Sequence, residues 1–229
     1  MKRITLVFLV LTFCATAFAG ESQLQKATNV INEIMSTPDK GIPHDLLDKA
    51  VCVGIVPSEV KFAFVVGGSY GRGVLVCRKG GDGRWDAPSM FTMGGASVGF
   101  QIGGEATDVV FLVMNPEGMK KLVQDSVKLG AELSAAAGPV GRSADGATDA
   151  QLHAEILSYS RSRGLFAGAS LDGAVYKQDE DDNQKVYGRR VTAKEILIDG
   201  TVPSPRSAQG LDGTLRKYSP SGGRTFARL

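Results

Sequence analysis

The spacing of hydrophobic positions divides the chain into a helical first part and a strand-rich remainder. Apolar residues recur every three or four positions from 22 to 35, and Leu24, Ile31 and Ile34 belong to this stripe. Such spacing predicts an amphipathic helix. A short second helix is expected over 43–50, after which the chain continues in Val-rich runs.

Most of the remaining pattern is typical of β-strands. The runs 51–56 and 61–66 are continuously apolar, as in strands buried on both faces. The alternating segment 160–176 predicts a strand that buries Leu165 and Ala167 on one face. Further strands are expected over 95–103, 107–114, 129–137 and 154–159, and further helices over 115–127, 192–197 and 207–218.

This order of elements favours an α+β fold built on an antiparallel sheet, because strands are many and regular β-α-β alternation is missing. The 229 residues include 29 glycines, many of them inside predicted strands. Glycine in a strand marks a bend, a bulge or a close approach of another backbone. We therefore expect a strongly curved, barrel-like antiparallel sheet with Gly-rich strands and a few flanking helices.

Residues 1–19 have the pattern of a signal peptide: two basic residues, a short apolar run and a small-x-small cleavage site. The apolar run is shorter than the roughly 20 residues that span a bilayer, which argues against a retained anchor. Lipoprotein processing at Cys14 is the rival interpretation, and the bulky Phe13 before it argues against that. We expect a mature chain that starts at Gly20 and is periplasmic or secreted.

Charge argues against nucleic acid as a partner. Without the two basic residues of the predicted signal peptide, the 26 Lys and Arg fall to 24, equal to the 24 Asp and Glu. A nucleic-acid binder needs a basic face to neutralise phosphates. The acidic run 179–182 is interpreted as solvated surface, and residues 219–229 as a disordered tail.

Two cysteines remain in the predicted mature chain, Cys52 and Cys77. An even number of cysteines in an exported chain permits a disulfide. Both stand among Val and Leu in predicted strands, so a bridge and a pair of buried free thiols both remain open.

No arrangement of residues indicates catalysis, a metal site or a cofactor. His44 and His153 are the two histidines of the sequence, and neither has Cys or carboxylate neighbours at metal-ligand spacing. Ser97 matches Gly-x-Ser-x-Gly in letters, but the strand alternation continues through it, whereas a nucleophile elbow turns into a helix. From the residues alone we expect an exported, Gly-rich globular domain that is not an enzyme.

A series of motifs resembles the SYLF domain family, and the resemblance runs from about Gln25 to Leu215. It places a SYLF-type domain over residues 20–218. In chain order the main motifs are Ile42-Pro43, Val66-Gly67-Gly68, Gly71-Arg72-Gly73, Gly99-Phe100-Gln101-Ile102-Gly103-Gly104, Ala137-Gly138-Pro139-Val140-Gly141-Arg142 and Ser162-Arg163-Gly164-Leu165-Phe166-Ala167-Gly168.

The resemblance implies a non-enzymatic, lipid-binding module. Eukaryotic members bind phosphoinositides and, in fungal relatives, actin filaments. An exported protein meets actin only if it is delivered to a host, so we do not expect actin as a partner. The family's lipid binding is attributed to a basic N-terminal helix, whereas helix 22–35 has Lys26 as its only base. We therefore expect an anionic lipid or a membrane surface as partner; the resemblance implies phosphoinositide binding, and the scarcity of bases on this helix argues against an electrostatic mode of it.

Seven residues are the expected lipid contacts. Guanidinium and ammonium groups bind phosphate, and an exposed apolar helix face enters the membrane interface. The phosphate contacts are Arg142, Arg161, Arg163 and Lys26, and the apolar contacts are Leu24, Ile31 and Ile34. The structural alternative is that the arginines pair with acids and the helix packs on the sheet.

Two other functions fit the same pattern. The Gly-rich sheet face suits an envelope structural module that contacts an envelope protein. A curved sheet that encloses an acyl chain would make the protein a lipid carrier with an apolar cavity.

Overall fold

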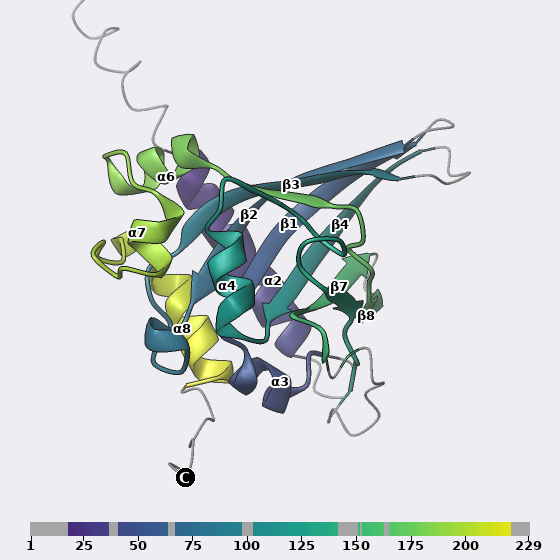
Figure 1. The fold of residues 1–229 in the computed structure, drawn as a ribbon, viewed down its shortest axis with the longest axis horizontal. Coiled ribbons are helices and arrows are strands. Elements are labelled where there is room, and N and C mark those ends of the chain that lie inside the picture. The colour runs from purple at the N-terminus through teal and green to yellow at the C-terminus, as the bar shows by residue number, and fades with distance from the viewer. Residues whose placement is uncertain are drawn as a thin grey trace, which may run out of the picture.

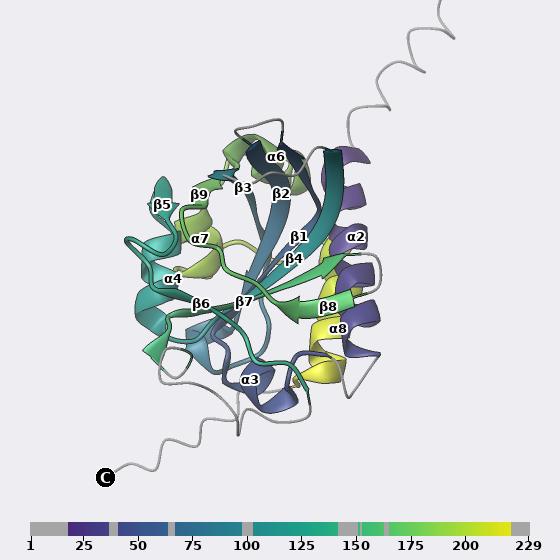
Figure 2. The same ribbon diagram turned by 90° about the vertical axis from the view of Figure 1, so that its right-hand side faces the viewer.

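The computed structural model describes residues 18–36, 41–63, 67–97, 103–141, 151, 153–162 and 165–220. Nine strands in this part of the chain form one strongly curled sheet, and helices pack on both of its faces (Figure 1, Figure 2). The predicted α+β class and the curved, barrel-like sheet are therefore confirmed. Cys14 lies outside the described residues.

The strands pair in the order β5-β9-β3-β2-β1-β4-β7-β6, and β8 pairs with β7. All pairs are antiparallel except β6 with β7. The strands are β1 Cys52–Ala63, β2 Gly67–Cys77, β3 Ser89–Ser97, β4 Gly103–Val113, β5 Ser126–Lys128, β6 Ala135–Ala137, β7 Ile156–Ser162, β8 Leu165–Gly168 and β9 Val175–Gln178.

The helices lie in two groups on opposite faces of the sheet. Helices α2 and α8 lie together on one face, and α4 and α7 lie on the other (Figure 2). The bounds are α2 Phe18–Met35, α3 His44–Lys49, η1 Lys79–Gly81, α4 Pro116–Leu122, α6 Glu180–Tyr187, α7 Ala193–Leu197, η2 Arg206–Ala208 and α8 Gln209–Tyr218.

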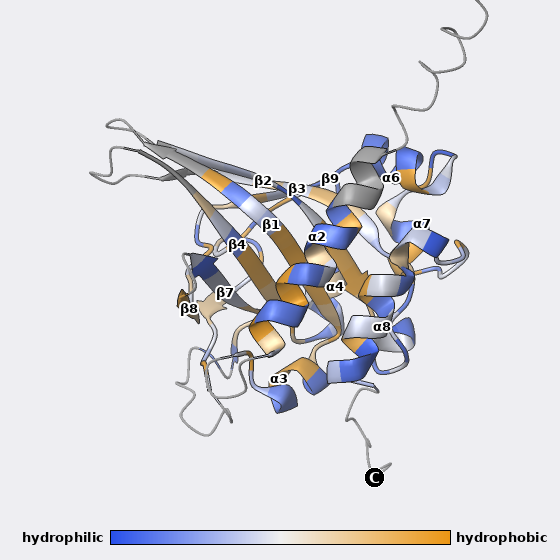
Figure 3. Cartoon of the chain, turned by 180° about the vertical axis from the view of Figure 1, so that it is seen from behind, coloured by the Kyte–Doolittle hydropathy of each residue, from blue (hydrophilic) through white to orange (hydrophobic). Residues whose placement is uncertain are grey.

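Each face of the sheet has its own hydrophobic core. The first core joins α2, α3 and α8 to inward residues of the central strands such as Val74 and Val110. The second core joins α4 and α7 to the opposite face through residues such as Phe91 and Phe111. Figure 3 shows the apolar strand residues beneath α2. Run 51–56 is buried on both faces, as predicted, whereas the side chains of the predicted run 61–66 lie outside the described part.

Two glycines in the central strands make room for aromatic rings. A Cβ at Gly54 would lie 2.1 Å from the ring of its cross-strand partner Phe111. A Cβ at Gly73 would lie 2.2 Å from the ring of Phe91, which is likewise its partner on the next strand. Any side chain there would therefore displace a buried ring.

Strand β1 contains a one-residue bulge between Val56 and Glu59. Its pairing with β2 and with β4 shifts by one residue at this place. Ser58 has a left-handed backbone with φ of 55°, and its N–H donates to Asp108 Oδ1 at 2.9 Å. The bulge joins the predicted run 51–56 to the first residues of the predicted run 61–66 in one strand, where the sequence predicted two, and residues 64–66 lie outside the described part.

The expectation for segment 160–176 is wrong. It contains the end of β7, all of β8 and the start of β9, in place of one strand. Leu165 is 79% exposed, whereas Phe166 packs on the core and stacks on Tyr159 with ring centroids 5.4 Å apart. The alternation was assigned to the wrong face because the larger ring of Phe166 takes the buried side.

Three other boundaries differ from prediction. Helix α4 ends at Leu122 and not at 127, because β5 begins at Ser126. The predicted strand 129–137 is reduced to β6, and β5 precedes it. Of the predicted strand 95–103, the first residues belong to β3 and the last to β4, and 98–102 lie outside the described residues.

The acidic run 179–182 is the start of a helix and not simply solvated surface. The Asp179 side chain accepts from the Asp182 N–H and caps α6. Asp182 itself is 3% exposed and accepts from Lys185 Nζ at 2.6 Å. Acidic residues in the first turn also suit the positive end of the helix dipole.

The expected tail start at Ser219 is also corrected, because Ser219 is fully buried. The guanidinium of Arg78, 1% exposed, donates to Ser219 and lies 3.9 Å from the centroid of the Trp85 ring. Trp85 Nε1 donates to the Ser219 carbonyl at 3.0 Å, and the Ser219 hydroxyl donates to Asp48. These contacts hold the end of α8 against the sheet. Residues 221–229 lie outside the described part.

Candidate functional site

The ends of four central strands project from the body of the molecule (Figure 1). Strand β7 pairs with β4 only from Asp108 to Val113, and β9 pairs with β3 only from Phe91 to Gly94. Beyond these pairs, β1 to β4 continue together as a projection that we call the finger. It comprises residues 59–63, 67–71, 95–97 and 103–107.

Three side chains form an exposed row across the finger. Val60 pairs with Tyr70 on one side and with Ala106 on the other. Val60 and Tyr70 are each 49% exposed, and Ala106 is exposed as well. We call these three residues the shelf. They continue the sheet face that α2 covers nearer the body of the molecule.

The bulge in β1 produces the shelf. Strand side chains alternate between faces, so one inserted residue moves every later side chain to the opposite face. Val56, before the bulge, belongs to the second core. Without the bulge Val60 would lie on that same face. With the bulge Val60 lies on the opposite face, where it is exposed. Glu59 takes the face of the second core and is 4% exposed.

Helix α2 packs across β1 and β2, the strands that carry Val60 and Tyr70 (Figure 3). Near its start, the Gln23 side chain donates to the Arg72 carbonyl on β2. Near its end, Glu33 pairs with Arg161 on β7. Lys26 lies between them on the same stripe of the helix, since residues three and seven positions apart share a face. Its side chain is exposed.

Arg72 stands next to Tyr70 on the same face of β2. A hydrogen bond with Tyr70 and the charge of Asp182 raise the pKa of Arg72 above its usual value. Its Nη1 lies 3.4 Å from Asp182 Oδ2, and about half of its side chain is exposed. The shelf therefore has a permanently cationic neighbour that is already paired with a buried acid.

Arg161 at the other border is held by two carboxylates. Its Nε donates to Asp108 Oδ2 at 3.0 Å, Nη2 donates to the same oxygen at 2.5 Å, and Nη1 donates to Glu33. Its side chain is 24% exposed, and burial lowers the pKa of Arg161. In this arrangement Arg161 ties α2 to the sheet, as the structural alternative proposed.

The other expected lipid contacts divide into two groups. Leu24, Ile31 and Ile34 are 1%, 0% and 3% exposed in the first core, so α2 turns its apolar stripe toward the sheet. A bilayer cannot touch these residues while the helix stays packed. Arg142 and Arg163 lie outside the described residues.

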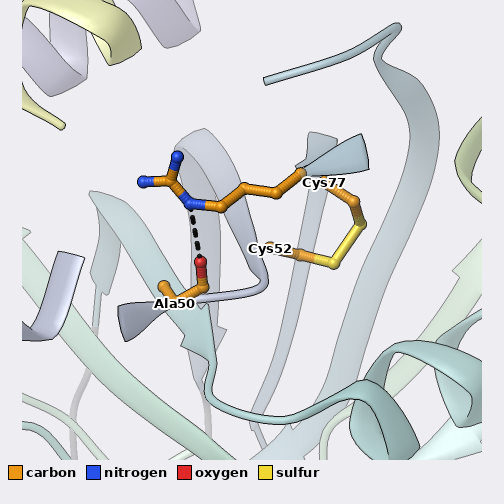
Figure 4. Close-up of a disulfide and its surroundings, with 4 residues drawn as sticks. Ala50, Cys52 and Cys77 are labelled. Carbon is orange, nitrogen blue, oxygen red and sulfur yellow. Dashed lines mark hydrogen bonds between the residues drawn. A yellow bond between two sulfur atoms is a disulfide. The ribbon is translucent and has the colours of Figure 1, made fainter. Parts of the chain in front are cut away.

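Cys52 and Cys77 are joined as a disulfide (Figure 4). They lie directly opposite each other on β1 and β2, with Cα atoms 4.0 Å apart, and both are buried. Ala50 lies beside the bridge, and its carbonyl accepts from Arg78 Nε at 3.1 Å. The disulfide stabilises the base of the strands that form the finger.

The described part of the chain offers little other chemistry. No group of three or more His, Cys, Asp or Glu side chains within it is placed to hold a metal ion. Ser97 is the last residue of strand β3, and the residues that follow it lie outside the described part. A cleft beside α6 is lined mainly by polar and acidic residues, including Asp125, Asp179 and Glu180, which does not suit an acyl chain. No described helix is long and apolar enough to cross a membrane.

Pro57 is the feature of the sequence that could have indicated the shelf. Pro57 stands within an otherwise apolar Val-rich run, and proline inside a strand indicates an edge or a bulge. A bulge there reverses the alternation that follows and exposes Val60.

Comparison with known proteins gives consistent similarities. Residues 94–218 match the family described as "Ysc84: Las17-binding protein actin regulator". The chain is 35% identical over 216 residues to LAS seventeen-binding protein 3 of Saccharomyces cerevisiae, covering 89% of this chain and 46% of that protein. It is 34% identical over 218 residues to SH3 domain-containing YSC84-like protein 1 of Homo sapiens, covering 91% of this chain and 63% of that protein. The chain thus spans about half to two thirds of these relatives.

Proposed function

Since this chain belongs to the SYLF (Ysc84) family, we propose that it is a non-enzymatic domain that binds a membrane surface through the shelf. The observation that carries the proposal is the exposed pair Val60 and Tyr70 on a projecting part of the sheet. The finger extends beyond the helix-covered body, so the shelf lies on a part of the sheet face that α2 leaves exposed (Figure 1).

The composition of the shelf suits a membrane interface. Tyrosine presents an apolar ring and a polar hydroxyl, a combination that favours the boundary between headgroups and acyl chains. About half of Val60 and of Tyr70 is still exposed, and covering it contributes on the order of 2 kcal/mol. Lys26 at the border adds about 1 kcal/mol at an anionic surface. These magnitudes predict weak, reversible attachment.

The place of action is the cell envelope or the exterior, on the evidence of residues 1–19. Mass spectrometry of the mature N-terminus tests this proposal. A first residue at Gly20 supports export by signal-peptide cleavage, and an intact Met1 or a lipid on Cys14 contradicts it.

A second candidate is a protein-interaction module. The family description and the name of the yeast relative refer to Las17 binding, and an exposed aromatic residue also suits a protein partner. For an exported chain the partner would be an envelope protein. This candidate uses the same shelf, so the experiment below distinguishes the two.

The test is co-sedimentation of the full chain with vesicles of mixed phosphatidylcholine and phosphatidylglycerol. Replacing Val60→Ser and Tyr70→Ser together should weaken vesicle binding at least tenfold, the equivalent of more than about 1.4 kcal/mol. Ile198→Ser is the control, since Ile198 follows α7 and is 38% exposed. If the double variant binds vesicles as well as the control, the shelf is not the membrane contact. Loss of an envelope protein from pull-downs with the same variant then favours the second candidate.

A further inference from the structure

Three cationic side chains border the shelf in the described part of the chain: Lys26, Arg72 and Arg161. Cations beside an apolar surface normally give preference for anionic lipids, about one kcal/mol for each free base. The pairing of these three side chains therefore decides whether the surface distinguishes headgroups.

Each of the three guanidinium nitrogens of Arg161 already donates to a carboxylate. Nε and Nη2 both donate to Asp108, and Nη1 donates to Glu33. Bidentate binding of a phosphate uses two parallel N–H donors, so a phosphate at Arg161 competes with Asp108 at the Nε and Nη2 edge and with Glu33 at Nη1. Asp108 is fixed in place, since its side chain is 15% exposed and its Oδ1 accepts from the Ser58 N–H in the bulge. Glu33, 56% exposed, is the partner that can be displaced.

Arg72 is paired in a similar way. Its partner Asp182 has a side chain only 4% exposed and also accepts from Lys185. A lipid phosphate that bound Arg72 would take this cation from the buried Asp182 and leave it paired with Lys185 alone. Of the three cations that border the shelf, Arg72 and Arg161 are paired with acids, and no described residue forms an ion pair with Lys26.

Resting on the function proposed above, we propose that Glu33 and Asp108 mask Arg161, so that the shelf binds membranes by apolar contact with little preference for anionic headgroups. Glu33 is then a residue that determines lipid specificity, and Arg161 is a structural tie between α2 and β7. This assignment replaces the expectation from the sequence that Arg161 contacts lipid phosphate.

The test compares binding of the full chain to vesicles of phosphatidylcholine alone and of phosphatidylcholine with phosphatidylglycerol. The wild-type chain should prefer the anionic vesicles by about fivefold, the contribution of one free base. Glu33→Gln removes a negative charge and frees Arg161 Nη1, so the preference should rise by about another fivefold. Binding to phosphatidylcholine alone should not change, which also shows that the variant is folded.

Glu117→Gln is the matched control. Glu117 is an exposed acid on α4 that pairs with Lys120 at 2.8 Å, so its replacement also removes one charge and one ion pair. It lies with α4 on the opposite face of the sheet and should leave the preference unchanged (Figure 2).

Three results would overturn the inference. A wild-type preference of a hundredfold or more that salt abolishes shows that electrostatic contacts dominate, while the proposed membrane function stands. A preference that is equal in the Glu33→Gln and Glu117→Gln variants shows that Glu33 masks nothing. Absence of binding to either vesicle rejects the proposed function and this inference with it.

Discussion

Single residues determine where this sheet makes room for a buried ring and which side chains it exposes. Gly54 and Gly73 lie under the rings of Phe111 and Phe91, so their missing side chains are part of the core packing. The positive φ of Ser58 marks the bulge that carries Val60 from the second core face to the shelf. The site therefore depends on backbone features as much as on its exposed side chains.

Replacing Gly54→Ala should lower the free energy of unfolding by about 1–3 kcal/mol, because the new methyl group overlaps the Phe111 ring. Gly213→Ala is the control: Gly213 is exposed in α8 with open space around it, and alanine there should stabilise by about 0.5–1 kcal/mol. Urea unfolding measures both. Adding Phe111→Leu should recover part of the loss at Gly54, and fully additive effects would contradict a direct contact.

At the scale of elements, the sequence correctly predicted the helices and strands that a local pattern of apolar residues and caps determines. Helix α2, helix α3, the buried run 51–56 of β1 and the helices α7 and α8 follow from apolar spacing and caps, such as the capping box of Thr192 and Glu195. The shelf was not predicted, because a bulge changes the facing of residues without changing their letters. The sequence could not determine whether Leu24, Ile31 and Ile34 are buried, for a related reason. An amphipathic stripe packs equally well on a sheet or on a membrane, and only the tertiary structure decides.

The disulfide gives a prediction for the strands themselves. The bridge between Cys52 and Cys77 closes a loop with a sequence separation of 25, for which chain entropy predicts a stabilisation of about 3 kcal/mol. The double replacement Cys52→Ala with Cys77→Ala should lower the free energy of unfolding by about this amount in urea. A reducing agent should destabilise the wild-type chain and leave the variant unchanged. Titration of free thiols at both positions in the unfolded, unreduced chain would contradict the bridge.

At the scale of the whole molecule, the fold separates a stable body from a projecting contact surface. Two cores, the buried Arg78 with Trp85, and the disulfide hold the base of the central strands. The finger continues these strands beyond the helices and presents Val60 and Tyr70 (Figure 1). By resemblance to the family, α2 would be the lipid-binding helix. In this chain α2 packs its apolar stripe on the sheet, so the proposed membrane contact is the sheet and not the helix.

Amide hydrogen exchange with and without vesicles tests this central claim most directly. The account predicts that amides of β1 and β2 around Val60 and Tyr70 exchange more slowly on vesicles, while the protection of α2 stays the same. Unchanged exchange in the finger, together with altered protection along α2, would show that the helix leaves the sheet to bind the membrane and would contradict the account.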